Sequence, residues 1–152
     1  MKNKVTDFLL RLIFPERCIV CRRFIPQGYI CDHCKGEDTA VSVNLNIAMG
    51  KGSRLVKVWA PHRYSGNYRQ NIHRFKFDGA YHKAEAIAKL IADRMPEDAF
   101  DGADFITFVP LNKETYRQRG YNQAELIARE LSKIKGTEVR DVIFKVRQNK
   151  PQ

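Results

Sequence analysis

Two cysteine pairs, Cys18-Ile-Val-Cys21 and Cys31-Asp-His-Cys34, decide how the N-terminal part of this chain folds. Two residues separate the cysteines of each pair, so both sulfur atoms can turn toward one point. Two such pairs complete the tetrahedron of a closed four-thiolate zinc site. The chain has 4 cysteines in total, so none is left over. We therefore predict a structural zinc ion bound by all four, with disulfide bonds or free thiols as the alternatives.

The N-terminus bears on this choice, because disulfides are rare outside oxidising compartments. Lys2 and Lys4 precede an apolar stretch, as in a signal peptide, but Asp7 and Arg11 interrupt it and no small-residue cleavage site follows. The apolar residues recur at helical spacing, which predicts a short amphipathic helix over residues 1–15. No apolar run approaches the ~18 residues of a membrane span. We therefore expect a cytoplasmic protein without a membrane span.

The residues between and after the cysteine pairs predict the domain organisation. Turn-forming residues, Pro26-Gln27-Gly28, lie between the pairs, as the hairpin of a zinc ribbon requires, and we call residues 16–38 the knuckle. Apolar and polar residues alternate weakly from 41 to 47, which is consistent with a short strand, before a glycine-rich break at 50–53. We place a domain boundary between residues 38 and 54, and a second domain over residues 54–152.

The second domain alternates strand and helix patterns. Apolar periodicity, capping residues and prolines predict strands over 55–60 and 105–109, helices over 68–77, 82–95 and 122–135, and one more strand or helical turn over 139–146. Alternation of this kind is typical of α/β domains with a parallel sheet. The predicted fold class is therefore α/β.

The chain is strongly basic. Its 152 residues include 27 lysines and arginines against 17 aspartates and glutamates, which gives a formal net charge of +10. Such a charge favours polyanionic partners, including nucleic acid and phosphorylated metabolites. General solubility is the alternative explanation.

The basic segment that most specifically suggests an anion site follows the predicted strand over residues 105–109. Ligands of open parallel sheets bind beyond the carboxyl ends of the strands, where the next helix offers unpaired N–H groups. Arginine can bind two phosphate oxygens at once, and glycine lets the backbone approach a ligand closely. The alternative is a solvated basic loop in which an asparagine caps the next helix. The candidate phosphate or pyrophosphate ligands are Lys113, Arg117, Arg119, Gly120 and Asn122.

A second polar cluster, over residues 63–79, mixes cations with aromatic residues, as sites for single-stranded nucleic acid do. The alternative is that its phenylalanines belong to the core. The candidate nucleic-acid ligands are Arg63, Arg74 and Lys76. His33, inside the second cysteine pair, is expected to be a bystander because four cysteines suffice for the metal. The sequence identifies no catalytic residue.

Taken in order, these segments resemble the ComF family of bacterial competence-related proteins, which are relatives of type I phosphoribosyltransferases. The matching features are the four-cysteine knuckle, the turn Tyr64-Ser-Gly66, and the segment Ile72-His-Arg-Phe-Lys-Phe-Asp-Gly79, which is similar to the family's lysine–aromatic–x–glycine motif. The most specific feature is Arg119-Gly-Tyr-Asn-Gln123 after the strand end Val109-Pro-Leu111. The resemblance covers essentially the whole chain.

The resemblance implies a type I phosphoribosyltransferase-like α/β domain joined to an N-terminal zinc ribbon. It also implies a role in natural transformation, where family members work with a DNA-uptake helicase on incoming single-stranded DNA. By the same resemblance, the loop from Pro110 to Arg119 corresponds to the region that meets pyrophosphate.

One feature of such enzymes does not occur in this sequence. They carry two adjacent acidic residues at a later strand end, followed by a Thr-Thr-Gly-like loop, and these hold phosphoribosyl pyrophosphate directly or through Mg²⁺. This chain has no acidic pair after an apolar run, and Glu97-Asp98 follows a helix end instead. We therefore expect a truncated, incomplete domain without transferase activity, which would need a completed site to bind Mg²⁺ with phosphoribosyl pyrophosphate. Its unpaired sheet edge would favour self-association.

Three functions follow from these patterns. The first is a ComF-like protein of DNA uptake without transferase activity. The second is an active phosphoribosyltransferase-like enzyme completed by a missing segment. The third is a zinc-ribbon adaptor that binds nucleic acid or protein and has no small-molecule site. Adding the missing segment and assaying pyrophosphate release separates the first two. Anion specificity separates the adaptor from both, because the adaptor would bind single-stranded DNA but not phosphoribosyl pyrophosphate, pyrophosphate or sulfate.

Overall fold

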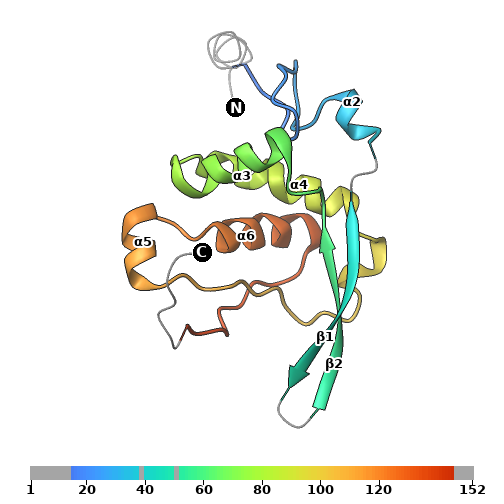
Figure 1. The fold of residues 1–152 in the computed structure, drawn as a ribbon, viewed down its shortest axis with the longest axis vertical. Helices are drawn as coiled ribbons and strands as arrows, with labels where there is room; N and C mark the ends of the chain where they lie inside the picture. The colour runs from blue at the N-terminus through green and yellow to red at the C-terminus, as the bar shows by residue number, and fades with distance from the viewer. Residues whose placement is uncertain (1–14, 38–39, 50–51, 146–152) are drawn as a thin grey trace.

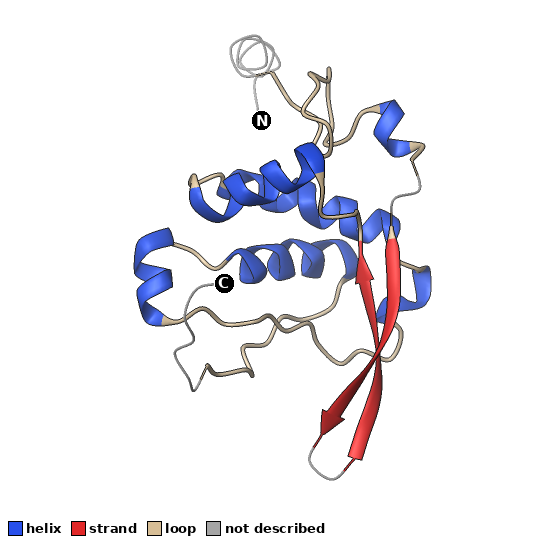
Figure 2. Cartoon of the chain, viewed as in Figure 1, coloured by secondary structure: helices blue, strands red, loops and turns tan. Residues whose placement is uncertain are grey.

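The computed structural model describes residues 15–37, 40–49 and 52–145. The predicted N-terminal helix, apart from residue 15, therefore lies outside the described residues. Two consecutive strands follow one short helix, and the elements after them are helices (Figures 1 and 2). The only sheet among the described residues has two strands. The elements are α2 (Asp32–Lys35), β1 (Val41–Met49), β2 (Gly52–Ala60), α3 (Gly66–Phe77), the 3₁₀ turn η1 (Tyr81–Lys83), α4 (Ala84–Arg94), the 3₁₀ turn η2 (Glu97–Phe100), α5 (Lys113–Arg119) and α6 (Gln123–Lys135).

Strands β1 and β2 form an antiparallel ribbon that extends away from the helices (Figure 1). Val43 pairs with Val58 and Leu45 with Val56, so these four side chains share one face of the ribbon. The valines of the first pair and Leu45 remain exposed to solvent. The ribbon spans the segment in which we placed a domain boundary.

The helices form the body of the molecule. Helix α4 packs against α6, and its Ala88 is fully buried. The predicted helices over 68–77, 82–95 and 122–135 are confirmed as α3, as η1 with α4, and as α6. Their apolar residues recur every three to four positions, which places one continuous stripe of each helix on the core.

The strand predicted over residues 105–109 is wrong for the described structure. Only Ile106 pairs there, in a single parallel bridge with Val139. The Ile106 N–H donates to the Glu138 carbonyl at 2.7 Å, and the Arg140 N–H donates to the Ile106 carbonyl at 2.9 Å. An apolar run becomes a strand only where neighbouring backbone satisfies its N–H and C=O groups, and one bridge on one side does not extend into a ladder.

The buried core joins the knuckle to the helices. Cys18, Ile19, Val20, Ile25 and Cys34 belong to one buried cluster with the α3 residues Tyr68 and Phe75 and with the α4 residues Ile87 and Leu90. The knuckle therefore packs on the body of the molecule instead of standing apart from it. Among the described residues, no helix is both long and apolar enough to cross a membrane.

Candidate metal centre and adjoining motifs

The four cysteines converge on one point. Their sulfur atoms all lie within 4.8 Å of one another, and the sulfurs of Cys21 and Cys31 are 3.6 Å apart. A tetrahedron with metal–sulfur bonds of about 2.3 Å has edges of about 3.8 Å, close to this separation. A disulfide bond would require about 2.05 Å, and all four residues are free cysteines. The set is therefore positioned to bind a metal ion and is compatible with structural zinc.

Backbone hydrogen bonds shape the first cysteine turn. The Arg22 N–H donates to the Cys18 carbonyl at 2.9 Å, and the Cys18 N–H donates to the Arg23 carbonyl at 2.9 Å. Arg22 has a φ of 68°, the only positive value at a non-glycine residue in the described part of the chain. This left-handed residue reverses the chain directly after Cys21 and lets the second sulfur of the pair face the first. An antiparallel bridge between Arg17 and Phe24 closes the turn.

The second cysteine pair sits on a helical turn. Cys31 precedes α2 and Cys34 lies within it, so the Lys35 N–H donates to the Cys31 carbonyl at 2.9 Å. A helical turn brings residues three apart onto the same face. This places the sulfur atoms of Cys31 and Cys34 side by side.

The thiols do not ionise alike. Burial raises the pKa of Cys18, but hydrogen bonds from the backbone N–H groups of Cys21, Cys31 and Val20 outweigh it and lower that pKa to about 7. Burial and the neighbouring sulfurs of Cys21 and Cys31 raise the pKa of Cys34 well above its usual range. Crowded thiolates repel one another, so a divalent cation is what allows all four to lose their protons together.

His33 lies at the edge of this centre. Its side chain is exposed, and its Nδ1 is 3.4 Å from a carboxylate oxygen of Glu37. His33, Cys34 and Glu37 also form a metal-compatible group, but that group shares Cys34 with the four-cysteine set. The four cysteines, two of them buried, are the better-formed ligand set, because a closed four-thiolate site needs no fifth ligand.

Polar side chains of the helices hold the backbone of the knuckle. Asn71 on α3 is only 3% exposed, and its Nδ2 donates to the Ile19 carbonyl at 2.6 Å. Arg94 on α4 donates to the carbonyls of Cys34 at 2.5 Å and Pro61 at 3.0 Å. Sequence reasoning missed both residues. The available signal was that Asn71 interrupts the apolar stripe of α3, where a polar residue needs a buried partner.

The predicted phosphate loop contains a helix. Asn112 caps α5 by accepting a hydrogen bond from the Thr115 N–H at 2.6 Å, and Gly120 ends it with a φ of 77°. Lys113 and Arg119 stand at opposite ends of α5, roughly 9 Å apart along its axis. Lys113 and Arg117 are exposed. Lys113 and Arg119 would therefore approach a shared ligand from opposite ends of α5.

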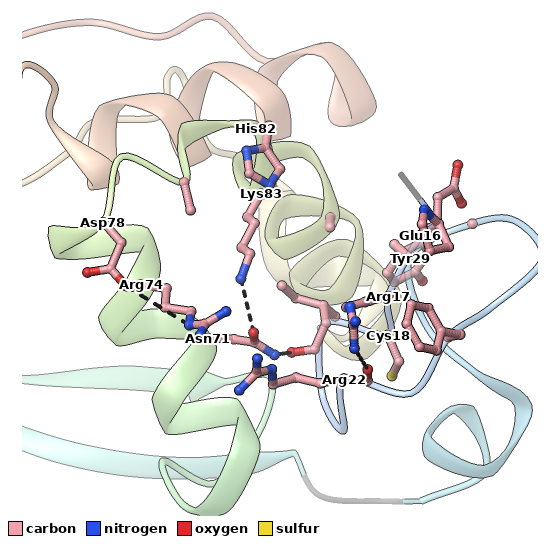
Figure 3. Close-up of a pocket in the computed structure, with 16 residues that line it drawn as sticks. Glu16, Arg17, Cys18, Arg22, Tyr29, Asn71, Arg74, Asp78, His82 and Lys83 are labelled. Atoms are coloured by element: carbon pink, nitrogen blue, oxygen red, sulfur yellow. Dashed lines mark hydrogen bonds and ion pairs between the residues drawn. The ribbon is translucent and has the colours of Figure 1, made fainter. Parts of the chain in front are cut away.

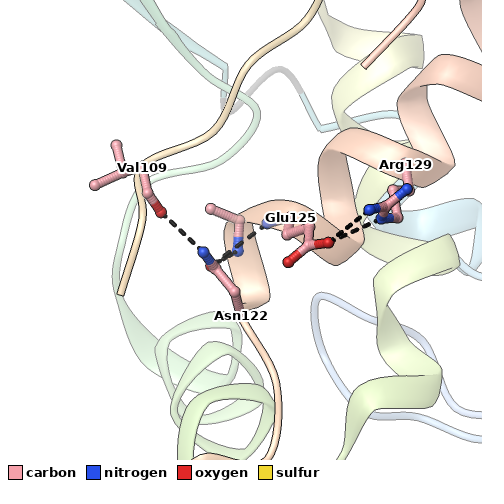
Figure 4. A network of polar contacts seen from close by, with 5 residues as sticks. Val109, Asn122, Glu125 and Arg129 are labelled. Atoms are coloured by element: carbon pink, nitrogen blue, oxygen red, sulfur yellow. Dashed lines mark hydrogen bonds and ion pairs between the residues drawn. The ribbon is translucent and has the colours of Figure 1, made fainter. Parts of the chain in front are cut away.

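Asn122 is a structural cap. It is 5% exposed, its Oδ1 accepts from the N–H groups of Ala124 at 3.0 Å and Glu125 at 3.4 Å, and its Nδ2 donates to the Val109 carbonyl at 3.0 Å (Figure 4). Figure 4 shows how this side chain links the end of the 105–109 segment to the first turn of α6. The first N–H groups of α6 therefore donate to the Asn122 side chain. This confirms the alternative prediction that Asn122 is an N-cap.

The two segments that carry the family resemblance meet in space. The Tyr121 hydroxyl donates to the Phe75 carbonyl at 2.5 Å, and Gln123 Nε2 donates to the Lys76 carbonyl at 3.1 Å. The Arg119 guanidinium lies 4.6 Å from the centre of the Phe77 ring. The Arg119–Gln123 block thus binds the C-terminal end of α3 through three successive contacts.

The nucleic-acid candidates occupy different surroundings. Arg63 is exposed before α3, whereas Arg74 and Lys76 lie in its last turns. Arg74 forms a loose ion pair with Asp78 at 4.0 Å. Phe75 is buried in the core, but Phe77 is 56% exposed. The core reading therefore holds for Phe75 and not for Phe77, and the nucleic-acid reading stays a prediction.

Comparison of this chain with family models, with curated proteins and with solved structures found no match.

Proposed function

We propose that this chain is a ComF-like protein of DNA uptake that binds single-stranded DNA next to a structural zinc centre. The observation that supports this most directly is the contact between Phe77 and Arg119. These residues come from the two motifs of the resemblance, and the exposed ring lies against the guanidinium at 4.6 Å. Exposed aromatic faces interleaved with cations bind successive bases by stacking and the phosphates by charge.

Neighbouring side chains extend this face. Tyr81 on η1 is 64% exposed and packs edge-on against Tyr121, with ring centres 6.2 Å apart. The His73 ring lies 4.6 Å from the Phe77 ring on the same side of α3. Arg74 and Lys76 flank these rings on α3 and contribute positive charge. We call Phe77, Tyr81 and Arg119 the stacking face.

The parallel bridge between Ile106 and Val139 supports the phosphoribosyltransferase-like part of the proposal. Helices α5 and α6 lie between the two bridged segments in the sequence, so the chain crosses over from one segment to the other and pairs with it in the parallel sense at this one bridge. The resemblance implies a phosphoribosyltransferase-like α/β domain, and domains of this class join parallel segments by helical crossovers. In this proposal the protein acts beside a DNA-uptake helicase and has no transferase activity as this chain.

Anisotropy with a fluorescent oligothymidine at two salt concentrations tests the proposal. We expect binding that weakens as salt rises, because phosphate contacts release counterions. Phe77→Ala should weaken binding by roughly 5- to 100-fold, the effect of one lost stacking contact. Arg119→Gln should weaken binding and reduce the salt slope by about one.

Phe144→Ala is the matched control, because Phe144 is also an exposed phenylalanine and is not one of the residues of the stacking face. It should bind DNA like the unaltered protein. Equal losses in Phe77→Ala and Phe144→Ala, or no binding of the oligonucleotide at low salt, would contradict the proposal. Metal content is measured in each variant to verify that the knuckle is intact.

An active phosphoribosyltransferase-like enzyme is the second candidate, and the same parallel crossover favours it. Release of pyrophosphate from phosphoribosyl pyrophosphate, in the presence of Mg²⁺, would support it over the first proposal. Binding of DNA without any response to phosphoribosyl pyrophosphate or pyrophosphate would favour the adaptor.

A further inference from the structure

A cavity of about 950 Å³ lies between the knuckle and the corner formed by α3 and η1 (Figure 3). Its walls come from residues 15–29 on one side and 71–86 on the other. Concave sites of roughly 300–1,000 Å³ are the usual size for small-molecule ligands. Of the four cysteines, only Cys18 lines this cavity, and no residue of the stacking face does.

Positive charge dominates the cavity wall. Four permanently or normally cationic side chains, Arg17, Arg22, Arg74 and Lys83, face two carboxylates, Glu16 and Asp78. Arg74 forms an ion pair with Asp78 at 4.0 Å, and both of these side chains are about half exposed. Among the ion pairs of the described residues, none includes Arg17, Arg22 or Lys83.

Lys83 is held in place by a buried amide. Its Nζ donates to Asn71 Oδ1 at 3.0 Å, and Asn71 in turn donates to the Ile19 carbonyl (Figure 3). Burial lowers the pKa of Lys83, and the charges of Arg74 and Arg22 lower it further. Arg74 and Arg22 therefore repel Lys83, and an anion between them would relieve that repulsion.

Arg22 links the cavity to the metal centre. It follows Cys21 directly, and its guanidinium donates to Gln70 Oε1 on α3 at 3.1 Å. The turn that positions Arg22 is the one that brings the first two cysteines together. The cavity wall on this side therefore depends on a correctly folded knuckle.

We propose that this cavity binds the phosphate group of a small phosphorylated molecule through Arg22, Arg74 and Lys83. Phosphate fits better than a single carboxylate, because its several oxygens can accept hydrogen bonds from two guanidinium forks and an ammonium group together. A small molecule fits better than a polymer, because the site is a concavity between two packed segments. The proposal does not rest on the role in DNA uptake.

Calorimetry of the metal-loaded full chain with adenosine monophosphate tests this site, with adenosine as the phosphate-free control. Adenosine monophosphate should bind at least about tenfold more tightly than adenosine, the difference expected for one or more charge-assisted hydrogen bonds. Lys83→Gln and Arg74→Gln should each weaken its binding about tenfold. Asp78→Asn should strengthen binding roughly two- to fivefold, because it removes a carboxylate that competes for Arg74.

Lys89→Gln serves as the matched control, because it makes the same charge change on α4 outside the cavity wall. It should leave the affinity for adenosine monophosphate unchanged. Arg119→Gln, which alters the stacking face, tells whether the nucleotide binds there instead. An affinity that falls in Arg119→Gln but not in Lys83→Gln would overturn the proposal and assign the nucleotide to the stacking face.

The competing role of these cations is to balance the net negative charge of a four-thiolate metal centre. In that case adenosine monophosphate and adenosine would bind equally or not at all, which would overturn the proposal. If Lys83→Gln fails to fold, Asp78→Asn still tests the site. The proposal predicts that Asp78→Asn binds adenosine monophosphate more tightly, and unchanged binding would count against the site.

Discussion

Asn122 makes more structural hydrogen bonds than any other residue of the Arg119–Gln123 block. Its amide accepts from two N–H groups of α6 and donates to the Val109 carbonyl (Figure 4). Asn112 makes a simpler cap, because it accepts only from the Thr115 N–H. The two asparagines therefore form a natural pair for measuring what the additional tertiary bond contributes.

We expect Asn122→Ala to lower the free energy of unfolding by about 1.5–2.5 kcal/mol. The lost cap accounts for about 1 kcal/mol. The lost hydrogen bond to the carbonyl of Val109, an exposed residue, accounts for about 0.5–1.5 kcal/mol. Asn112→Ala should cost only about 1 kcal/mol. Urea unfolding followed by circular dichroism measures both, and a larger loss in Asn112→Ala would show that the Val109 bond contributes little.

Tyr68 on α3 is 6% exposed and packs against the His62 ring at 4.7 Å. Burial raises the pKa of Tyr68 to about 12, against an opposing effect of the Arg94 charge. The folded pKa thus lies above the ordinary value near 10, so the unfolded chain ionises first as the pH rises. The contribution of this tyrosine to stability is complete below pH 10 and is lost as the pH approaches 12.

We expect Tyr68→Phe to flatten the loss of stability between pH 10 and pH 12. The free energy of unfolding of the variant should fall by roughly 2–3 kcal/mol less than that of the unaltered protein over this interval. Urea unfolding at pH 9 and at several values up to pH 12 provides the measurement. Tyr64→Phe, at an exposed position, is the control, and parallel pH profiles for all three proteins would refute the assignment.

At the scale of elements, α3, α4 and α6 could be predicted because each combines an apolar stripe with recognisable ends. Helix α5 could not be predicted by periodicity, because its seven residues, KETYRQR, carry no apolar stripe. Its signals were the bounding residues, Asn112 as N-cap and Gly120 as the left-handed C-cap. Because we predicted a loop here, we did not expect a helix that places Lys113 and Arg119 at its opposite ends.

Strands are harder to predict than helices because their hydrogen bonds come from other segments. Residues 105–109 have the apolar composition of a buried strand, but in the described structure their pairing is limited to the bridge between Ile106 and Val139. By contrast, the weak alternation over 41–47 gave a full strand, because β2 lies within reach through a short hairpin connection. The two segments differ in whether a neighbouring strand can pair with them, and the composition of a segment does not encode this.

For the chain as a whole, the cysteine spacing predicted that the four sulfurs lie together, but it did not predict how the knuckle is attached to the helices. Asn71 and Arg94 contact the knuckle from 52 and 60 residues away in the sequence. Such contacts depend on the tertiary arrangement of α3 and α4 and leave no local pattern. The same holds for the cavity, whose cations come from both sides of the interface.

The shared core makes a prediction about metal removal. Because Cys18 and Cys34 are buried together with Phe75 and Leu90, loss of the metal should destabilise α3 and α4 as well as the knuckle. Structural zinc contributes roughly 10–16 kcal/mol in small domains, which exceeds the stability of many whole domains. We expect Cys21→Ser and Cys31→Ser to lose the metal and much of their helical circular dichroism.

Elemental analysis and thermal melting check this prediction. His33→Ala is the control, because it removes a neighbouring side chain that lies outside the four-cysteine set, and it should retain both metal and helicity. Full helicity in a metal-free Cys21→Ser protein would mean that the helices do not depend on the knuckle. Metal loss in His33→Ala would instead place the histidine among the ligands.

The shared core also has a consequence for synthesis on the ribosome. Leu90, a core partner of the knuckle, follows Cys34 by 56 residues. At roughly 5–20 residues per second, translation separates the two by about 3–11 seconds. During that interval the four thiols have emerged without their apolar cover, so early capture of the metal would protect them from oxidation until the helices arrive.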